Sequence, residues 1–277
     1  MNLREIAPKL ELGPDGCWSS RNIRDVFYPA EGNDLCFTIE DSSFWFGHRN
    51  RCILEALKLF PPPGTIFDVG GGNGFVARAL QESGLQVVLV EPGPAGVRNA
   101  LKRGIRQVVR ATLEDAGVLG ETLPAVGLFD VVEHIPDDCG FLAGIKPLII
   151  PGGRVYITVP AYQWLWSGED VLAGHSRRYS VGSLRRVIEK AGYVVEFATY
   201  FFGFLPLPIF FHRALPYRLG LRAKEVSEDT ARSDHEVSHP LADRMLRILT
   251  SRELSRIANR RPLRMGASCL VVARKPE

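Results

Sequence analysis

The sequence predicts an α/β fold in which a doubly wound parallel sheet carries helices on both faces. Between residues 65 and 200, apolar runs of strand length alternate with segments of helix length. A glycine-rich turn follows the first run, and the second run ends in an acid. Such alternation favours parallel strands, because each helix crosses over between two of them. A chain of 277 residues with 45% apolar composition can form one such domain with appended segments.

The elements follow from turn signals and apolar spacing. Residues 1–43 carry mixed turn signals and are expected to form an irregular N-terminal lead-in. A helix is expected from Ser43 to Phe60, ended by the prolines at 61–63. Strands are expected at 66–69, 86–91, 105–109, 123–130, 154–160, 193–199 and 267–274, and helices at 73–83, 94–103, 138–146, 180–191 and 241–259. The main domain is therefore expected to span 44–200 plus 267–277, with a helical, basic and apolar insertion at 201–266.

The turn after the first strand is the most informative feature. Glycines at 70, 71, 72 and 74 let the backbone bend sharply and leave no side chain between it and a ligand. The following helix points unpaired N–H groups at the same place. Glu91 lies 21 residues after Gly70, where two-strand nucleotide units place the carboxylate that holds ribose hydroxyls. A nucleoside ligand is expected; the alternative, a tight turn alone, needs fewer glycines.

The glycine spacing distinguishes between nucleosides. A dinucleotide fold would require glycine at position 75, which is Phe75. Asp68 followed by Gly70-x-Gly72-x-Gly74 resembles the first motif of the class I S-adenosylmethionine-dependent methyltransferases. The resemblance implies S-adenosylmethionine as cofactor, with its amino-acid part on the glycine turn and its ribose on Glu91. It also implies a Rossmann-like sheet of seven strands with an antiparallel last strand, here with the insertion between strands six and seven.

The same resemblance implies further cofactor contacts. After the third strand, Glu114 or Asp115 would meet the adenine, or one of them caps a short helix. The aromatic segment 44–51 resembles a lid, from which Arg49 would reach the cofactor carboxylate; plain core packing is the alternative for its aromatics. The full set expected at the cofactor is Asp68, Gly70, Gly71, Gly72, Gly74, Glu91, Pro92, Leu113, Glu114, Asp130 and Arg49.

Two loops are candidates for acceptor chemistry. Residues 129–137 resemble the Glu-His-(Ile/Val)-Pro-Asp stretch of the quinone-biosynthesis-like branch, which makes His134 a candidate general base or a residue that holds the loop. The loop after the fifth strand supplies His175 as a second catalytic candidate. Trp164, Arg178 and Tyr179 are expected to bind the acceptor; alternatively, the arginines pair with acids of the same loop.

Charge and cysteine content exclude other classes. The net charge of +3 does not suggest a nucleic-acid partner, although residues 201–264 hold twelve Lys or Arg against seven acids. An apolar run edged with arginine at 200–222 fits an acceptor cover or, alternatively, peripheral contact with a membrane surface. Five scattered cysteines predict neither a metal site nor disulfides. A cytoplasmic protein is expected, alternatively peripheral to the inner face of the membrane.

Together these features predict an enzyme that moves a methyl group from S-adenosylmethionine to a small-molecule or lipid-like acceptor. Oxygen is favoured over nitrogen or carbon as the atom methylated. Two alternatives are an NAD(P)-dependent oxidoreductase, against which Phe75 argues, and a non-catalytic module that binds S-adenosylmethionine.

Overall fold

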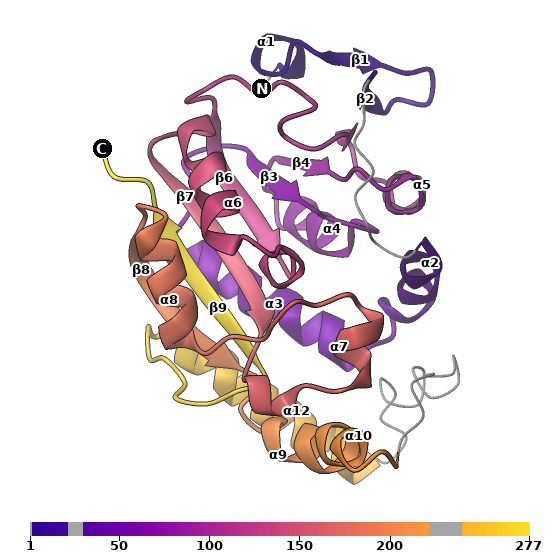
Figure 1. Cartoon of the computed structure of the whole chain (residues 1–277), viewed down its shortest axis with the longest axis vertical. Coiled ribbons are helices and arrows are strands. Elements are labelled where there is room, and N and C mark those ends of the chain that lie inside the picture. The colour runs from indigo at the N-terminus through magenta and orange to yellow at the C-terminus, as the bar shows by residue number, and fades with distance from the viewer. Residues whose placement is uncertain (1, 22–29, 222–239) are drawn as a thin grey trace.

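The computed structural model describes residues 2–21, 30–221 and 240–277. Within these ranges the chain forms one mixed sheet between two layers of helices (Figure 1). Its strands are β1 (Leu10–Leu12), β2 (Trp18–Ser20), β3 (Ile66–Val69), β4 (Val87–Val90), β5 (Val108–Arg110), β6 (Leu123–Phe129), β7 (Ile149–Pro160), β8 (Val194–Phe201) and β9 (Ser268–Arg274). Its helices are α1 (Leu3–Ile6), α2 (Ala30–Ile39), α3 (Phe44–Leu59), α4 (Phe75–Glu82), α5 (Pro94–Lys102), α6 (Asp138–Ile145), α7 (Gly168–Leu172), α8 (Val181–Lys190), α9 (Pro206–Ile209), α10 (Leu215–Arg218) and α12 (Pro240–Ala258).

The strand order is β1-β2-β5-β4-β3-β6-β7-β9-β8. The five strands from β5 to β7 are parallel, as the alternating sequence pattern predicts. The predicted antiparallel last strand is confirmed, because β9 pairs antiparallel with both β7 and β8. Strands β3, β4 and β6 are buried along their whole length, which explains their continuous apolar character.

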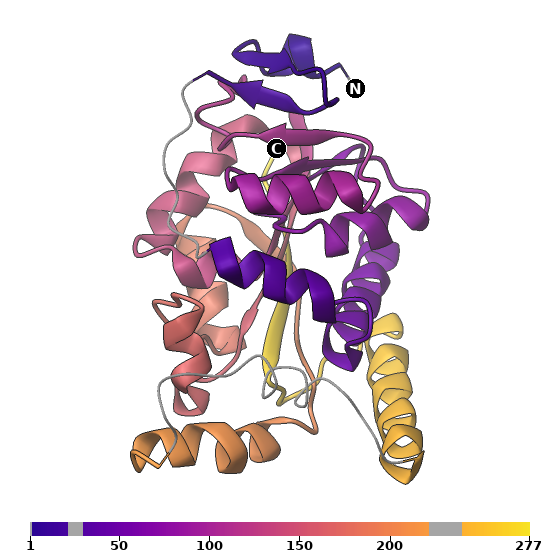
Figure 2. The ribbon, with the colours of Figure 1, turned by 90° about the vertical axis from the view of Figure 1, so that its right-hand side faces the viewer.

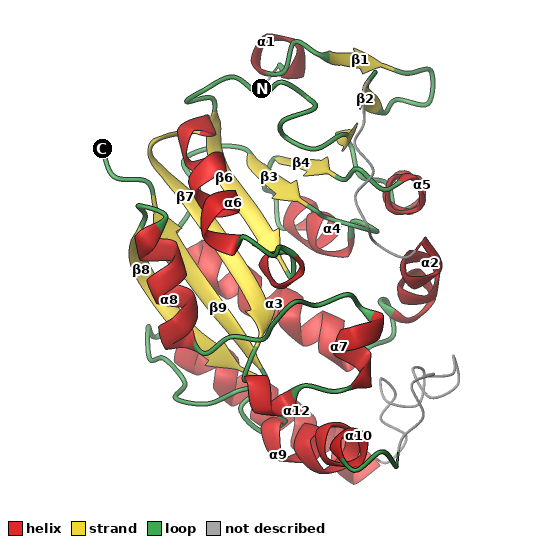
Figure 3. Ribbon diagram, in the orientation of Figure 1, coloured by secondary structure: helices red, strands yellow, loops and turns green. Residues whose placement is uncertain are grey.

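Helices cover both faces of the sheet (Figure 3). On one face, α6 and α8 bury Leu142 and Leu184 in a core with the sheet. On the other face, α3 and α4 bury Ile53 and Leu80. The parallel strands therefore end at one edge, between the two helical layers, where open α/β sheets bind ligands.

Two expectations about strand number and the N-terminus are wrong. The described sheet has nine strands rather than seven, because β1 and β2 form a hairpin that extends it, with Trp18 opposite Val109 of β5. The lead-in at 1–43 is also not irregular, since it holds α1, this hairpin and α2. Strands of three residues show too little alternation to be recognised, and the turn signals at 13–16 mark the hairpin turn.

The described part of the insertion between β8 and β9 holds α9, α10 and α12, joined by non-helical segments. Residues 22–29 of the lead-in and 222–239 of the insertion lie outside the described residues. Helix α12 packs against α3, and both lie behind the sheet in Figure 1. Glu253 of α12 joins the two helices through a buried contact of 2.8 Å between its Oε2 and His48 Nε2.

Candidate active site

A cavity of about 330 Å³ lies at the carboxyl ends of β3, β4 and β6. Helix α2 contributes to its wall and lies in front of this edge of the sheet in Figure 2. The lining of the cavity includes eight of the eleven residues expected at the cofactor: Arg49, Asp68, Gly70, Gly71, Gly72, Glu91, Pro92 and Asp130. The fold therefore brings the glycine turn, the end of β4 and the end of β6 to one place.

The glycine turn needs glycine for two different reasons. Gly70 and Gly72 have φ angles of +70° and +49°, in the left-handed region where other residues are strained. Gly71 is required by contact, because an added Cβ would lie 2.9 Å from Asp68 Oδ2 and from Leu89. A side chain at Gly71 would therefore collide with the groups packed beneath the turn.

Glu91 ties this turn to the end of β4. Its carboxylate accepts hydrogen bonds from the backbone N–H groups of Gly72 (2.9 Å) and Gly93 (2.6 Å). Burial raises the pKa of Glu91, while these two bonds oppose the rise. The carboxylate is thus fixed in position at the cavity wall.

Asp68, on the same wall of the cavity, has one carboxyl oxygen that accepts no hydrogen bond from the described residues. The side chain is buried, and its Oδ2 has no hydrogen-bond partner among the described residues. Burial raises the pKa of Asp68 to about 7, against the opposing effect of the Arg49 charge. A cationic group in the cavity would stabilise the ionised form.

Asp130 is held from two directions. Arg49 of α3 donates to its Oδ2 at 2.5 Å, and Thr158 of β7 donates to its Oδ1 at 3.0 Å. Its φ of +59° is unusual for a residue other than glycine, and such strain concentrates at functional sites. Arg49 therefore links the expected lid helix to the end of β6.

Sequence reasoning missed the contribution of α2 and of Glu40, which follows it. Asn33, Cys36 and Glu40 line the cavity. Glu40 accepts from Arg103 Nη1 at 2.6 Å, and the backbone oxygen of Asn33 accepts from Asn73 Nδ2 at 2.8 Å. No local pattern pairs Glu40 with Arg103, 63 residues away, so the sequence held no signal for this wall.

The structure does not place the other expected cofactor residues on this cavity. Leu113 is a core residue and Glu114 is exposed, and neither lines the cavity. Gly74 supports the site from behind, since an added Cβ would lie 2.9 Å from Ile105. The adenine contact expected from Glu114 or Asp115, and the place of Leu113 in the cofactor set, therefore stay predictions.

The residues expected at the acceptor also lie off the described lining. Tyr179 is 3% exposed and donates its hydroxyl to Asp138 at 2.7 Å, which is a structural contact. Arg178 donates to Asp170 at 2.7 Å, as in the alternative in which the arginines pair with acids of their own loop. Trp164 stacks on Tyr162 with ring centroids 5.5 Å apart.

The two catalytic candidates lie side by side. His134 lines the cavity and His175 does not, and their ring centroids lie 4.8 Å apart. Burial and the neighbouring His175 lower the pKa of His134 to about 4, so its imidazole is neutral near pH 7. His175 Nδ1 lies 2.7 Å from Asp170 Oδ1, a contact that orients the ring.

Comparison with known proteins adds independent information. A family model described as a methyltransferase domain matches residues 44–196, more than half of the chain. The chain is 29% identical over 150 residues to the ubiquinone biosynthesis O-methyltransferase of Aeromonas salmonicida, covering 47% of this chain and 63% of that protein. It is 34% identical over 124 residues to the protein of the same name from Methylocella silvestris, covering 41% and 48%. The chain thus spans about half to two thirds of the length of these relatives.

Among solved structures, the phosphoethanolamine N-methyltransferase 2 of Haemonchus contortus, in complex with phosphomonomethylethanolamine and S-adenosylhomocysteine, has a similar fold. Its TM-score is 0.56 at 21% identity, covering 90% of this chain and 59% of that one. At this identity the likeness concerns the fold alone.

Proposed function

Because the chain belongs to the methyltransferase domain family, we propose that it transfers the methyl group of S-adenosylmethionine to an oxygen of a small-molecule or lipid-like acceptor. The observation that carries the proposal is the cavity itself. There a glycine turn without side chains and a fixed carboxylate on Glu91 line one volume together with the buried Asp68. Relatives named as O-methyltransferases favour oxygen over nitrogen or carbon.

The residues of the cavity suit the groups of this cofactor. Its α-ammonium group would compensate the buried Asp68, whose Oδ2 has no partner among the described residues. The remaining lone pairs of Glu91 would accept from ribose hydroxyls. The glycine turn lines the cavity with backbone alone, beside which the amino-acid part would lie.

The cofactor supplies a methyl group on a positively charged sulfur. The chain positions the reactants and excludes water from them. Residues of α2 and α3 line the cavity, and Arg49 fixes Asp130 at the end of β6. His134, neutral near pH 7, takes the proton of the acceptor hydroxyl. Alignment of donor and acceptor contributes most of the rate, and proton removal contributes less.

Calorimetry with S-adenosylhomocysteine tests the proposal. One molecule should bind per chain, and Glu91→Ala should weaken binding at least tenfold, because the substitution removes the ribose contact and frees the glycine turn. Glu82→Ala, at an exposed position of α4, is the matched control and should leave binding unchanged. Absence of heat with this compound would refute the proposal, and heat with NADH instead would favour the oxidoreductase alternative.

Acceptor identity is tested by methyl transfer. A panel of phenols with and without an isoprenoid tail should show transfer to oxygen, detected by mass spectrometry. Binding of the cofactor without transfer to any acceptor would favour the non-catalytic module.

The five cysteines are free thiols, which fits the proposed cytoplasmic location.

A membrane surface is a second proposed contact, through residues 200–222. Four apolar side chains here are 59% to 76% exposed: Leu207, Phe211, Leu219 and Leu221. Residue 222 itself lies outside the described residues. Within the described ranges no helix combines the length and apolarity that crossing a bilayer requires.

A further inference from the structure

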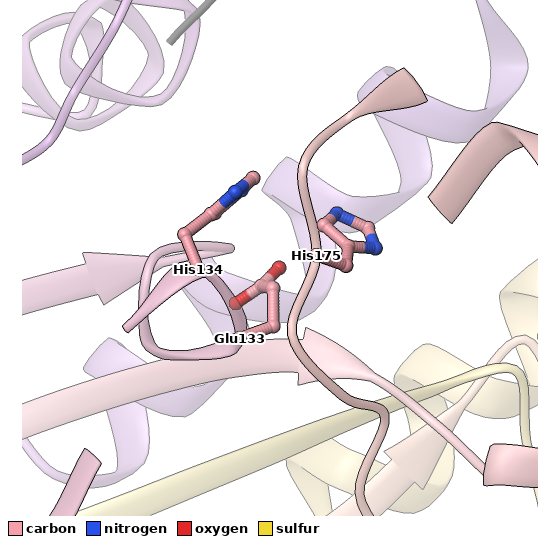
Figure 4. A group of neighbouring side chains, drawn as sticks. All are labelled: Glu133, His134 and His175. Atoms are coloured by element: carbon pink, nitrogen blue, oxygen red, sulfur yellow. The ribbon is translucent and has the colours of Figure 1, made fainter. Parts of the chain in front are cut away.

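Two segments of the chain meet beside the cavity. The β6 turn (residues 132–138) leads from β6 into α6, and the β7 loop (residues 173–179) leads from α7 into α8. Figure 4 shows the β7 loop, which carries His175, passing beside the β6 turn. Both segments reach the cavity, the turn through His134 and the loop through Ala173. The position of the loop on the turn therefore shapes one side of the cavity.

Hydrogen bonds to the backbone of the turn hold the β7 loop in place. The backbone N–H of Ser176 donates to the carbonyl oxygen of Glu133 at 2.7 Å. Arg177 donates from its Nη2 to the carbonyl oxygen of Pro136 at 2.6 Å. The loop thus follows the turn over several residues.

Asp138, the last residue of the β6 turn, accepts two further hydrogen bonds from the loop. Its Oδ2 accepts from the Tyr179 hydroxyl at 2.7 Å and from Arg177 Nη1 at 2.8 Å. Tyr179 is 3% exposed and the Asp138 side chain 12%, so water competes little for this carboxylate. Hydrogen bonds to an ionised acceptor are roughly twice as strong as neutral ones. Asp138 is therefore the strongest side-chain link between the two segments.

The loop in turn fixes the ring of His134. This ring is hydrogen-bonded to the backbone of Gly174. The N–H of Gly174 donates to the carbonyl oxygen of Val171 at 3.1 Å, so its own carbonyl oxygen accepts from His134. Gly174 has a φ of +72°, a conformation that other residues rarely adopt. The backbone of the β7 loop therefore decides which ring nitrogen of His134 carries the proton, since a carbonyl oxygen cannot donate.

We propose that Asp138 is a positioning residue, which holds the β7 loop on the β6 turn so that Gly174 fixes the tautomer of His134. The other ring nitrogen of His134 is then the one that takes the acceptor proton. As the acceptor oxygen bonds to the methyl carbon, its proton passes to this nitrogen, and the sulfur keeps the electron pair of the broken S–C bond. This last role rests on the proposed function, whereas the tautomer is a property of the protein without acceptor.

¹⁵N NMR of the histidine-labelled protein measures the tautomer directly. At neutral pH the two ring nitrogens of His134, assigned with His134→Gln, should give the separate signals of one tautomer. Asp138→Ala removes both side-chain links to the loop, so the two signals should move toward each other as the second tautomer becomes populated. Two tautomers in the wild type, or wild-type signals in Asp138→Ala, would overturn the proposal.

Asp137→Ala is the matched control at the neighbouring position. Asp137 caps α6, where its carboxyl group accepts from the Gly140 N–H at 2.9 Å. Removing this cap should lower stability but leave the His134 signals as in the wild type. Equal changes of these signals in Asp137→Ala and Asp138→Ala would show that the start of α6, and not the link to the loop, orients the ring.

A milder variant serves if Asp138→Ala does not fold. The Arg177 side chain is 33% exposed, and Arg177→Gln removes its bonds to Asp138 and Pro136 while Tyr179 keeps its own. The His134 signals should move in the same direction by a smaller amount. Signals that stay unchanged in this variant would contradict the proposed role of the link.

Methyl transfer provides a second readout. Asp138→Ala should lower kcat roughly tenfold, as part of the roughly 10²- to 10⁴-fold that proton transfer contributes. It should leave affinity for S-adenosylhomocysteine unchanged, because Asp138 does not line the cavity. A loss of stability with kcat and the His134 signals unchanged would mean that Asp138 only supports α6, against the proposal. Absence of transfer by the wild type would refute the proposed function, while the NMR signals still decide the role of Asp138.

Discussion

At the scale of single residues, the cavity concentrates acids whose charges are compensated in different ways. Glu91 accepts from two backbone N–H groups, and Asp130 accepts from Arg49 and Thr158. Asp68 keeps one bare oxygen, and Glu133 keeps two. The buried carboxyl of Asp68, which lines the cavity, is therefore the one whose charge a cationic ligand would compensate.

Asp68 makes cofactor affinity dependent on pH. With a pKa of about 7, its carboxyl is ionised above pH 7 and protonated below it. An ammonium group favours the ionised form, so affinity for S-adenosylhomocysteine should be highest near pH 8 and fall about tenfold by pH 6. Calorimetry at pH 6, 7 and 8 measures this, and Asp68→Asn should remove the dependence.

The same group affects stability with the opposite sign. Unfolded Asp68 ionises near pH 3.9, whereas the folded residue ionises near 7, so without ligand the free energy of unfolding should fall as pH rises between these values.

For the pH dependence of cofactor binding, the control is Asp243→Asn, at a surface ion pair with Arg247, which should retain the wild-type pH profile of binding. An unchanged profile in Asp68→Asn would contradict the assignment.

At the scale of elements, the site depends on how α4 meets the sheet. Gly74 precedes α4 with a φ of +76°, and an added Cβ would lie 2.9 Å from Ile105 and 3.2 Å from Ala100. Gly74→Ala should lower the free energy of unfolding by about 2 kcal/mol, because strain and contact add. Chemical denaturation measures this.

Gly144→Ala provides the matched control, since an added Cβ in α6 meets nothing within 4 Å and the φ is not positive. That substitution should be neutral or stabilise by up to about 1 kcal/mol. Equal losses in the two variants would show that the backbone of the turn is not specially constrained.

A second prediction concerns the contact between the insertion and the core. Glu253 of α12 is 5% exposed and accepts from the N–H groups of Phe202 (2.9 Å) and Gly203 (2.5 Å), besides contacting His48. Glu253→Ala leaves these buried groups without a partner and should cost about 3 kcal/mol. Glu189→Ala, at an exposed pair with Arg185, should cost less than about 0.5 kcal/mol in the same denaturation experiment. A small loss in Glu253→Ala would mean that water replaces the carboxylate.

Sequence reasoning succeeded where chemistry is local. Strand β3, the glycine turn and Glu91 follow one another within 26 residues, and period and glycine content predicted each of them. It failed where chemistry is distant: the pairing of Glu40 with Arg103 and of Arg49 with Asp130 joins segments 63 and 81 residues apart. The short hairpin β1–β2 also lay below what alternation can indicate.

At the scale of the whole molecule, the insertion makes one end of the protein apolar. The segment that runs from α9 through α10 to residue 221 leaves Leu207, Phe211, Leu219 and Leu221 exposed, and Arg218 lies in the same segment. Figure 2 shows these helices and α12 at the end opposite to the β1–β2 hairpin. Apolar side chains flanked by arginine suit an anionic lipid surface, where a lipid-like acceptor would be found.

The full protein should therefore sediment with vesicles of phosphatidylcholine and phosphatidylglycerol. Combining Phe211→Glu and Leu221→Glu should lower the bound fraction at least fivefold, since each places a charge where an apolar contact is needed. Leu119→Glu is the control. Leu119 is 47% exposed, but its backbone N–H donates to the carbonyl oxygen of Ile6 in α1, so it lies at the hairpin end of the molecule and away from the insertion. High salt should release part of the bound protein by screening the arginines. If the double variant sediments like the wild type, the exposed apolar side chains of residues 207–221 do not contact lipid, and the insertion serves the acceptor alone.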